Sequence, residues 1–273
     1  MLLGAARIRG CNGETDVIRA ASVSNSRPLG AIILAAGLGT RMRSDRAKVL
    51  HEIAGRPLLH YPLRALAPLA PAKVVVVVGH QADAVRQAAL SAGLAGVETA
   101  LQAEQNGTGH AVQCALPAFQ DFEGDILILY GDVPLIQTNT LRQLVTSHQQ
   151  AGATLSLLTV CFDDPTGYGR IVRDEAGRVR GIVEQKDASP TERAITEINP
   201  GFYCVRSSAL SLLEQLRTNN AQGELYLTDL VGLVAGRGER IETVQIERAD
   251  EVAGINTPSE LARMDAIIRA ENP

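Results

Sequence analysis

The sequence predicts an α/β protein in which a mixed, mostly parallel central sheet is flanked by helices and joined to a smaller antiparallel part. Three patterns carry this prediction. From Ala31 onward, short apolar runs alternate with longer segments of helical period, as they do where helices pack on a parallel sheet. The run from Val74 to Val78 is apolar on both faces, which is typical of a parallel strand covered on each side. After about Thr159, hairpin patterns replace this alternation.

The first half of the chain is predicted to alternate strands and helices. Pro57 near the start of one helical segment and Gly93 after the end of another mark helix limits, because proline fits the first helical turn and glycine fits the residue after the last. Strands are expected at residues 31–34, 73–78, 97–101, 125–129 and 154–160, and helices at 57–69, 82–92, 108–116 and 138–151.

The second half is predicted to be more antiparallel. Residues 170–173 and 179–184 flank Asp174-Glu175-Ala176-Gly177, which indicates a hairpin with glycine at the end of its turn. Further strands are expected at residues 202–205 and 240–246, and helices at 207–216, 227–235 and 258–270.

Composition excludes several classes of partner. Of the 273 residues, 45% are hydrophobic and 21% charged, the balance of a globular protein with its own core. A net charge of −4 supplies no general attraction to nucleic acid, and four Phe and five Tyr without a Trp are too few for single-strand stacking. No apolar run reaches the ~18 residues of a membrane-spanning helix. We therefore expect small-molecule ligands, with neither a nucleic acid nor a membrane as partner.

Residues 1–29 differ in pattern from the rest of the chain. They lack the apolar stretch of a secretory signal, and Glu14 and Asp16 interrupt the acid-poor pattern of a transit peptide. We expect a disordered extension over residues 1–29, one domain over residues 30–273, and a cytoplasmic location.

The cysteines offer no metal or redox motif. They lie far apart, with no C-x-x-C pair and no neighbouring histidine cluster, so zinc and thioredoxin-type sites are excluded. We expect Cys11, Cys114, Cys161 and Cys204 to be buried, reduced thiols.

A glycine-rich turn follows the first predicted strand, in Leu34-Ala35-Ala36-Gly37-Leu38-Gly39-Thr40-Arg41-Met42. Ligands of open α/β sheets lie beyond the carboxyl ends of strands, and glycines let backbone N–H groups approach a phosphate. The turn is neither a P-loop nor a dinucleotide fingerprint, which needs Gly or Ala where Met42 stands. Arg41 and Lys48, seven residues apart, would face one anion if the segment is helical. The alternatives are a plain strand-to-helix turn and two solvated cations.

A second motif joins the strand expected at 97–101 to the next helix, in Gln102-Ala103-Glu104-Gln105-Asn106-Gly107-Thr108. The Gln102 amide and the backbone at Gly107 offer the paired donors and acceptors that a nucleobase edge requires. The alternative is that Thr108 caps the helix and Gln102 is solvated. His110, inside the helix, is expected to pack in the core.

A third motif, Tyr130-Gly131-Asp132, ends another buried strand. One aspartate at the carboxyl end of a strand suits Mg²⁺, which takes oxygen ligands and shares its shell with substrate phosphates. Asp132 is therefore the leading candidate for a metal ligand. The alternative is an aspartate that forms the turn before Pro134.

These motifs together resemble a known family. The turn from Leu34 to Met42, followed by Lys48-Val49-Leu50, is similar to the signature loop of sugar-phosphate nucleotidylyltransferases. More narrowly, residues 30–271 resemble the uridylyltransferase domain of bacterial enzymes that also carry a glucosamine-1-phosphate acetyltransferase domain. Segments 164–171, 181–184, 197–199 and 223–229 match the same domain. The resemblance implies a Rossmann-like nucleotidyltransferase fold, with UTP and N-acetylglucosamine 1-phosphate as substrates and Mg²⁺ as cofactor.

The resemblance also implies a role for each motif residue. Arg41 and Lys48 would be catalytic, and Asp132 and Asn256 would hold the metal, although Asn256 by itself could cap the last helix. The sugar would lie on Gly169, Glu184, Asn199 and Asn256. The nucleotide would lie on Leu34, Ala35, Ala36, Gly37, Gly39, Thr40, Gln102, Gly107, Thr108, Tyr130, Gly131 and Asp132.

The sequence departs from the family at two places. Pro200 stands where the family has Thr after the Asn, which removes a backbone N–H beside the sugar. The sequence does not include the hexapeptide repeats that carry acetyl transfer and trimerisation in the family, so we assign no acetyltransferase activity to it and expect a monomer rather than a trimer.

The predicted reaction is attack of the N-acetylglucosamine 1-phosphate oxygen on the α-phosphorus of UTP, giving UDP-N-acetylglucosamine and pyrophosphate. The attacking oxygen is already an anion, so alignment and charge neutralisation would suffice for catalysis. Two alternatives stay open. One is another nucleotidylyltransferase, joining UTP or dTTP to glucose 1-phosphate, and the other is a non-catalytic sensor of nucleotide sugars.

Overall fold

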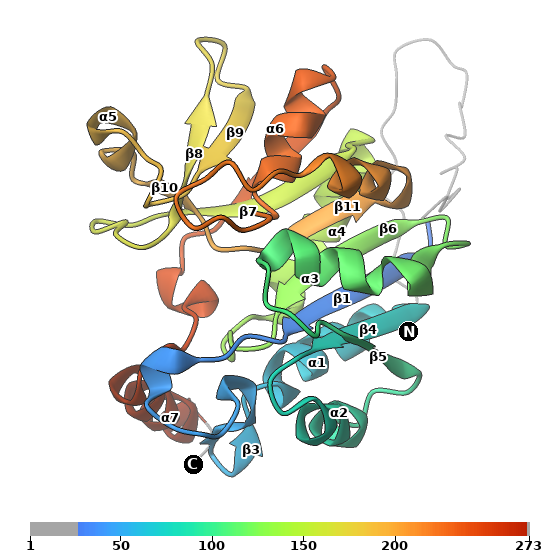
Figure 1. Ribbon diagram of the computed structural model, residues 1–273, viewed down its shortest axis with the longest axis vertical. Helices are drawn as coiled ribbons and strands as arrows, with labels where there is room; N and C mark the ends of the chain where they lie inside the picture. Colours follow the sequence, from blue (N-terminus) through green and yellow to red (C-terminus); the bar gives the residue numbers. More distant parts are fainter. Residues whose placement is uncertain (1–26, 272–273) are drawn as a thin grey trace, which may run out of the picture.

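At the centre of the molecule, in the computed structural model that describes residues 27–271, ten strands form one continuous sheet with helices on both faces (Figure 1). The strand order is β5-β4-β1-β6-β11-β7-β10-β8-β9, and β12 also pairs with β7. The strands are β1 (Leu29–Ala35), β4 (Lys73–Val78), β5 (Val97–Leu101), β6 (Asp125–Tyr130), β7 (Leu155–Cys161), β8 (Gly169–Arg173), β9 (Val179–Val183), β10 (Glu197–Asn199), β11 (Tyr203–Arg206) and β12 (Ile241–Gln245). The predicted α/β class is confirmed.

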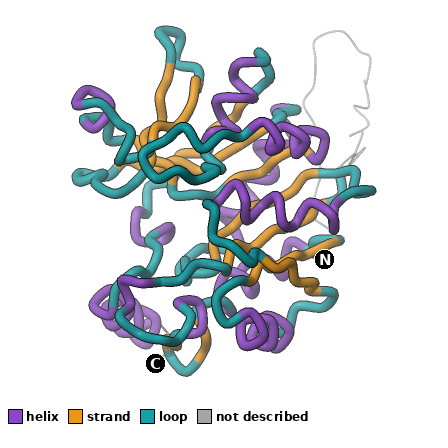
Figure 2. The backbone as a smooth tube through the Cα atoms, viewed as in Figure 1, coloured by secondary structure: helices purple, strands orange, loops and turns teal. Residues whose placement is uncertain are grey.

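The parallel half of the sheet is buried between two layers of helices (Figure 2). Successive residues of β1 point to opposite faces, so Ile33 packs with Leu63 on one side while Ile32 packs with Val112 on the other. One face is covered by α1 (His60–Leu66), α2 (Ala82–Ser91) and α4 (Thr138–Ala151), and the other by α3 (Thr108–Ala115), α6 (Asp229–Gly236) and the 3₁₀ helix Ser207–Gln215. Within the described chain, no helix is both long and apolar enough to cross a membrane.

The antiparallel half continues the same sheet. β11 pairs antiparallel with both β6 and β7, and β10 pairs antiparallel with both β7 and β8. Between β10 and β11 the chain breaks its pairing at Pro200 and Gly201, where Gly201 has φ of +93° and lies against the Tyr130 ring. A Cβ on Gly201 would stand 2.2 Å from the Tyr130 ring, so only glycine fits this close approach. Pro200 and Gly201 line a cavity together with Tyr130, the last residue of β6, and Gly169, the first residue of β8.

Several predicted elements have different limits in the structure. The helix expected from residue 57 begins at His60, because Ala54 and Gly55 both have positive φ and turn the chain into a hairpin of β2 (Glu52–Ile53) and β3 (Arg56–Pro57). Residues 207–215 form a 3₁₀ helix. The helix expected at residue 227 begins at Asp229. Neither β10 nor the single-turn α5 (Pro190–Arg193) was predicted, because each is too short to show a period.

The last helix, α7 (Pro258–Glu271), packs against the β2–β3 hairpin (Figure 1). Met264 and Ile268 form a third apolar cluster with Ile53 of this hairpin and Met42 of the glycine-rich turn. The Ala54 N–H also donates to Asp265 Oδ1 at 2.7 Å. Packing on the hairpin brings the residues just before α7 close to the glycine-rich turn, more than 200 residues earlier in the chain.

Arg27, Pro28 and Leu29, which the sequence placed in the extension, belong to the folded unit. Leu29 begins β1, opposite Asp125, and Arg27 Nε lies 2.8 Å from Asp125 Oδ1. The rest of the predicted extension, residues 1–26, lies outside the described residues.

The cysteines only partly follow the expectation of burial. Cys204 is buried, whereas Cys161 at the end of β7 is exposed and Cys114 on α3 is half-buried. Cys11 lies outside the described residues. Every residue of β7 before Cys161 is buried, and only this last residue of the strand reaches solvent.

A buried polar network ties β6 to α4 and β7. His148 Nε2 lies 3.2 Å from Asp125 Oδ1, His148 Nδ1 lies 2.8 Å from Ser156 Oγ, and Gln149 Nε2 donates to Asp125 Oδ2 at 3.0 Å. Burial on its own raises the pKa of the Asp125 carboxyl, but the hydrogen bonds from His148, Arg27 and Gln149 outweigh it and lower this pKa to about 2. The ionised carboxylate is therefore the form that the fold stabilises.

We expect Asp125→Asn to lower the free energy of unfolding at pH 7 by about 2 kcal/mol, the value of a pKa depressed from 3.8 to about 2. Because the folded-state pKa is the lower one, this stability is present above pH 4 and is lost as the pH falls toward 2. Urea denaturation at pH 7, 4 and 3 should show the two proteins converging at low pH. The exposed Asp121→Asn serves as control, and a constant difference at every pH would contradict the prediction.

Candidate active site

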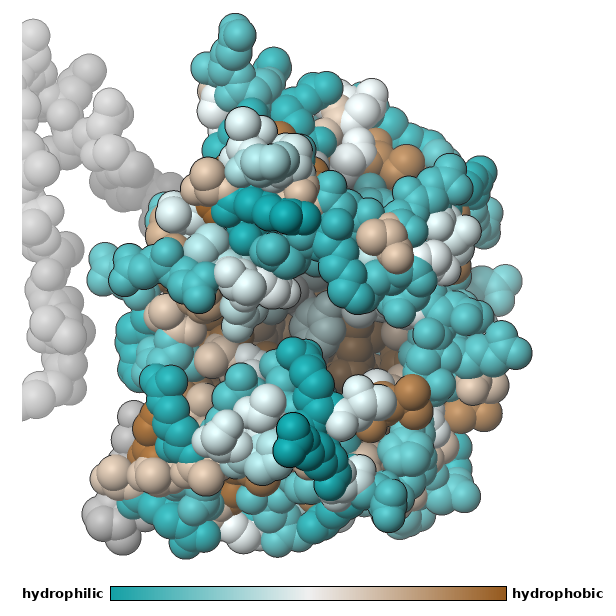
Figure 3. Space-filling view, turned by 60° about the vertical axis from the view of Figure 1, so that its left-hand side comes forward, coloured by the Kyte–Doolittle hydropathy of each residue, from teal (hydrophilic) through white to brown (hydrophobic). Residues whose placement is uncertain are grey.

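Two adjoining cavities lie beyond the carboxyl ends of the central strands. The first has a volume of about 240 Å³ and the second about 520 Å³, and both are lined by Thr108, Tyr130, Asp132 and Glu224. Figure 3, which brings forward the side on which β1 and β6 end, shows the surface hollowed near its centre, with apolar residues deep inside and polar residues at the rim. The cavities thus occupy the position where ligands of open α/β sheets bind.

Most of the predicted site residues line one of these cavities. Those in the first are Leu34, Ala35, Ala36, Gly37, Lys48, Gln102, Gly107, Thr108, Tyr130 and Asp132. Those in the second are Arg41, Thr108, Tyr130, Asp132, Gly169, Glu184, Asn199 and Asn256.

Three predicted residues line neither cavity. A Cβ on Gly39 would lie 2.7 Å from Lys48 Cβ, so this glycine packs behind the lysine. Thr40 begins the 3₁₀ turn Thr40–Met42, and its carbonyl accepts from the Arg43 N–H. The Gly131 N–H donates to the Leu34 carbonyl at 2.9 Å, between β1 and β6. Gly39 thus lies behind Lys48, Thr40 is exposed at the surface, and Gly131 lies between two strands.

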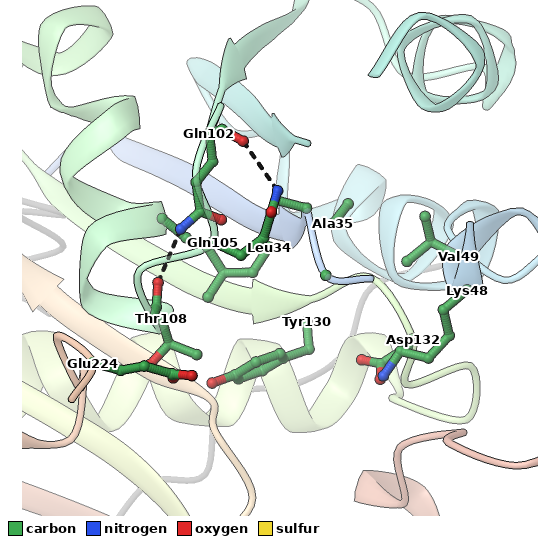
Figure 4. A pocket seen from close by; sticks show the side chains of 14 residues that line it. Leu34, Ala35, Lys48, Val49, Gln102, Gln105, Thr108, Tyr130, Asp132 and Glu224 are labelled. Carbon is green, nitrogen blue, oxygen red and sulfur yellow. Dashed lines mark hydrogen bonds and ion pairs between the residues drawn. The ribbon is translucent and has the colours of Figure 1, made fainter. Parts of the chain in front are cut away.

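Gln102 lies at the far end of the first cavity from Lys48 (Figure 4). Its side chain is not solvated, because only 3% of the residue is exposed. Its Nε2 donates to the Gly107 carbonyl at 3.0 Å, which orients the amide. With Nε2 bonded in this way, Oε1 is the group of the side chain left to act as an acceptor.

His110 does not pack as a core residue. It is half-buried, and its Nδ1 lies 3.0 Å from the Glu104 carbonyl and 3.2 Å from Gln102 Nε2. The expected core packing is therefore wrong, because the ring lies against the segment that carries Gln102 and Glu104.

The start of α3 is held by the chain around Leu225. The Gly109 N–H donates to the Leu225 carbonyl at 2.7 Å, and Thr108 Oγ1 accepts from the Leu227 N–H at 3.1 Å. Thr108 is therefore not a helix cap. Gly107 has φ of +105°, and a Cβ there would stand 2.5 Å from the Leu225 carbonyl oxygen, so both its conformation and its space require glycine.

The other end of the first cavity gathers charge from four segments of the chain. Lys48 Nζ lies 2.5 Å from Asp132 Oδ2 and 3.1 Å from Asn256 Oδ1, and Arg41 Nη2 donates to the same Asn256 oxygen at 2.8 Å. Lys48 and Asp132 face each other in Figure 4. The two cations predicted to share an anion therefore converge on one point, and they do so beside the predicted metal ligands.

Asn256 is not the cap of α7. Thr257 Oγ1 accepts from the Glu260 N–H at 3.2 Å, and Glu260 Oε2 accepts from the backbone N–H groups of Asn256 and Thr257. This reciprocal arrangement is a capping box around Thr257, and it leaves the Asn256 side chain free of the helix. The Ile255 N–H donates to the Asp132 carbonyl at 3.0 Å, which fixes the two candidate ligand segments side by side.

The donor set at this point fits a divalent cation. A positive group, the Lys48 ammonium, already lies within 3.1 Å of both Asp132 Oδ2 and Asn256 Oδ1. A carboxylate and an amide oxygen are hard ligands of the kind that Mg²⁺ takes. Within residues 27–271 no cluster of three or more His, Cys, Asp or Glu side chains is placed to hold a metal alone, so substrate phosphate oxygens would complete its shell.

The second cavity is a ring of polar groups around the break between β10 and β11. Glu184 Oε1 accepts from Thr228 Oγ1 at 3.1 Å, while Asn199 Nδ2 donates to the Tyr203 hydroxyl at 2.6 Å. Burial raises the pKa of the Glu184 carboxyl and the neighbouring acidic groups raise it further, although the Thr228 hydrogen bond opposes them. A Cβ on Gly169 would meet Ile182 Cγ2 at 2.7 Å, so glycine is needed there.

Some cavity residues were not predicted. In the first cavity these are Val49, Gln105, Ala111 and Glu224, and in the second they include Tyr168, Tyr226 and Thr228. Pro200, which was expected beside the sugar, does line the second cavity. The spacing of Glu224-x-Tyr226-x-Thr228 was the available signal, because alternate residues of an extended segment point the same way. The segment was recognised as a motif, but no residue in it was given a role.

Known proteins match the chain closely. The pattern of the family described as "MobA-like NTP transferase domain" matches residues 31–228. The chain is 51% identical to "Bifunctional protein GlmU" of Pelobacter propionicus over 88% of this chain and 52% of that protein. It is also 49% identical to the proteins of the same name from Trichlorobacter lovleyi, over 88% of this chain and 52% of the relative, and Mycolicibacterium gilvum, over 86% and 48%.

The chain spans about half the length of the curated relatives that it matches. The family match covers most of β1, the glycine-rich turn, and β6 and β10, and with them every residue that lines the first cavity. It also covers most of the second cavity, although Asn256 lies beyond the match. Because this match covers most of the chain and the fold is a mixed sheet flanked by helices, the chain is a member of the MobA-like NTP transferase domain family.

Proposed function

We propose that this chain transfers UMP from UTP to N-acetylglucosamine 1-phosphate, releasing pyrophosphate and forming UDP-N-acetylglucosamine. The observation that carries the proposal is the convergence of Arg41, Lys48, Asp132 and Asn256 where the two cavities meet. Two phosphorylated substrates placed in adjoining cavities would bring their phosphates together at that point. A cluster of two cations with a carboxylate and an amide suits phosphate and a divalent ion together.

The orientation of Gln102 supports uracil as the base. Its Nε2 is bonded to the Gly107 carbonyl, so Oε1 is the acceptor available to a base in the first cavity. Uracil carries a hydrogen on N3 and would donate to this oxygen. Cytosine has a bare nitrogen at N3, which would face the oxygen without a hydrogen bond and be rejected.

The second cavity supports a sugar phosphate as the acceptor substrate. Glu184, Asn199 and Thr228 place carboxylate, amide and hydroxyl groups around one space, and a hydroxyl-rich ring needs such partners when it is buried. We propose that Gly169, Glu184 and Asn199 bind the sugar, with Pro200 on the same wall.

In the proposed mechanism, a phosphate oxygen of the sugar phosphate attacks the α-phosphorus in line with the bond to the β-phosphate. A new P–O bond forms, the α–β bond breaks, and its electron pair leaves with pyrophosphate. Lys48 and Arg41 would donate hydrogen bonds to phosphate oxygens as negative charge builds on them, and the Ala36 and Gly37 turn would align the triphosphate. Mg²⁺, held by Asp132 and Asn256, would supply further charge neutralisation.

Pyrophosphate release from UTP, CTP, dTTP and ATP, each with N-acetylglucosamine 1-phosphate and glucose 1-phosphate, tests the proposal. We expect rapid release only with UTP and N-acetylglucosamine 1-phosphate. Higher kcat/KM with glucose 1-phosphate or dTTP would show that a related nucleotidylyltransferase is the correct assignment. No release from any pair, combined with tight binding of UDP-N-acetylglucosamine in calorimetry, would favour the sensor instead.

The proposal includes a monomeric enzyme that works in the cytoplasm, as the sequence predicts. Light scattering coupled to gel filtration tests the first part, with a mass near the 29.0 kDa of one chain as the expected result.

A further inference from the structure

Gln81, at the start of α2, has a backbone conformation that the helix does not require. Its φ is +52° and its ψ is +44°, the left-handed region that L-residues other than glycine, asparagine and aspartate seldom adopt. Gln81 is the N-cap residue of α2, and an N-cap residue ordinarily has extended backbone and accepts a hydrogen bond from its own helix with its side chain. The Gln81 side chain makes no such bond to α2. Strained backbone that persists at one position is a reason to ask what the side chain does there.

Both polar groups of the Gln81 side chain bind the loop that follows the glycine-rich turn. Oε1 accepts from the Ala47 N–H at 2.9 Å, and Nε2 donates to the Asp45 carbonyl at 2.8 Å. His80 Nε2 lies 3.2 Å from the same carbonyl. The amide therefore holds two backbone groups that are two residues apart, more than 30 residues earlier in the chain.

Ala47 is the residue directly before Lys48, and it precedes the 3₁₀ turn Lys48–Leu50. The loop before it, residues 43–46, is exposed along its whole length, and Arg43 is also left-handed, with φ of +50°. The Gln81 amide is thus a fixed anchor at the point where the exposed loop returns to the body of the protein. Lys48 starts from this anchor and extends to Asp132 and Asn256.

We propose that Gln81 is a positioning residue for Lys48, acting through Asp45 and Ala47 without touching substrate. The inference rests on the proposed function, because it assigns to Gln81 the placing of a phosphate-binding cation for that reaction. Lys48 lies close to two oxygens of fixed position, so a small shift of its backbone changes where its ammonium meets a phosphate. Misplacement by about 1 Å can lower a rate on the order of 10²-fold.

Gln81→Gly separates positioning from folding. Glycine adopts the left-handed conformation without strain, so the variant removes the amide while the backbone of α2 keeps its conformation. We expect kcat to fall about tenfold, each KM to change less than about threefold, and the melting temperature to change little, because relief of the left-handed strain opposes the loss of two hydrogen bonds. Ala70→Gly is the matched control, since Ala70 is also left-handed, with φ of +49°, and follows the 3₁₀ turn Ala67–Leu69 at the other end of β4. Its activity should be unchanged.

A double-mutant cycle shows whether Gln81 acts through Lys48. In a Lys48→Ala background, Gln81→Gly should change kcat less than twofold, because the group that Gln81 positions is gone. An equal loss in both backgrounds would overturn the proposal, and so would wild-type kcat in Gln81→Gly alone.

Trypsin cleavage supplies a readout that needs no catalysis. The loop offers Arg43 and Arg46, and releasing its return end should increase cleavage after both, while global unfolding in urea is unchanged. Unchanged cleavage would overturn the proposed anchoring even if the chain proved inactive with UTP. Inactive wild-type protein whose loop is released by Gln81→Gly would instead remove the proposed function and retain the anchor.

Discussion

Replacing Lys48 by alanine should lower kcat by about 10²–10³-fold, the usual effect of removing one preorganised group that stabilises charge in a transition state. The Lys48 side chain is mostly buried, and its ammonium lies at the meeting point of the two cavities. Negative charge gathers on the triphosphate as the bond between the α-phosphorus and the bridging oxygen breaks. The Lys48 ammonium is already in place to stabilise this charge, whereas a cation from solvent would first have to bind and be oriented. Steady-state pyrophosphate release measures kcat, and calorimetry with UTP separates it from ground-state binding.

Two comparisons make the Lys48 result specific. Lys48→Arg keeps the charge with a different shape, so it should retain more activity than alanine and less than wild type. Lys73→Ala removes a lysine at the amino end of β4, whereas the cavities lie beyond the carboxyl ends of the strands. Lys73 Nζ donates to the Ala118 carbonyl, and its loss should leave kcat unchanged. Near-wild-type turnover in Lys48→Ala would remove this residue from the mechanism.

Asp132→Asn should produce a loss of similar size, about 10²–10³-fold in kcat, together with a higher Mg²⁺ concentration for half-maximal activity. The substitution keeps the size of the side chain and removes the negative charge that a divalent cation requires. Asp132 is 7% exposed, and the hydrogen bond from the Ile255 N–H to its carbonyl holds it beside Asn256. Water or a dissolved anion therefore cannot easily replace its carboxylate as a metal ligand. Activity titrated against Mg²⁺ from micromolar to tens of millimolar gives both quantities.

An exposed aspartate that lines neither cavity provides the control for Asp132→Asn. Asp83→Asn alters an exposed aspartate on α2 that pairs with Arg86, and its Mg²⁺ titration should match that of the wild type. If Asp132→Asn loses activity with an unchanged Mg²⁺ requirement, Asp132 acts by a route other than metal binding. Because Lys48 and Asp132 are in contact, the double variant should lose less than the product of the two single losses.

The parallel half of the fold was predictable from local patterns. The strand limits at 73–78 and 97–101 and the helix limits at 138–151 agree with the structure, since each is a complete apolar period bounded by turn residues. The hairpin of β8 and β9 also follows from its turn. The continuous sheet could not be predicted, because it depends on β11 pairing with β6 and β7, and strand pairing across long separations leaves no period in the sequence.

The candidate site shows the same division at the level of single residues. Thr108 and Asn256 both have sequence contexts in which a helix cap is the simplest interpretation. In the structure Thr108 Oγ1 accepts from Leu227 instead, and Thr257 caps α7 in place of Asn256. Glu224 became recognisable only when its segment was seen to line the same cavity as Tyr130. His110 contacts Gln102 through the fold of the short loop between them, which no helical period shows. The outcomes at Thr108 and Glu224 depend on partners that the local sequence does not contain, whereas the capping box of Thr257 and Glu260 follows from the spacing of those two residues.

By itself, the sequence determined most of the longer strands and helices and the short motifs that end them, because hydrophobic period and turn chemistry act over a few residues. It also determined the chemical groups available at the strand ends, among them Lys48 and Asp132. Only the tertiary structure decided that Asn256 meets Arg41 across 215 positions and that Gln81 holds the residue before Lys48. Such meetings arise from the packing of α7 on the β2–β3 hairpin and of α2 beside the loop, and packing depends on surfaces that form only after the elements have folded.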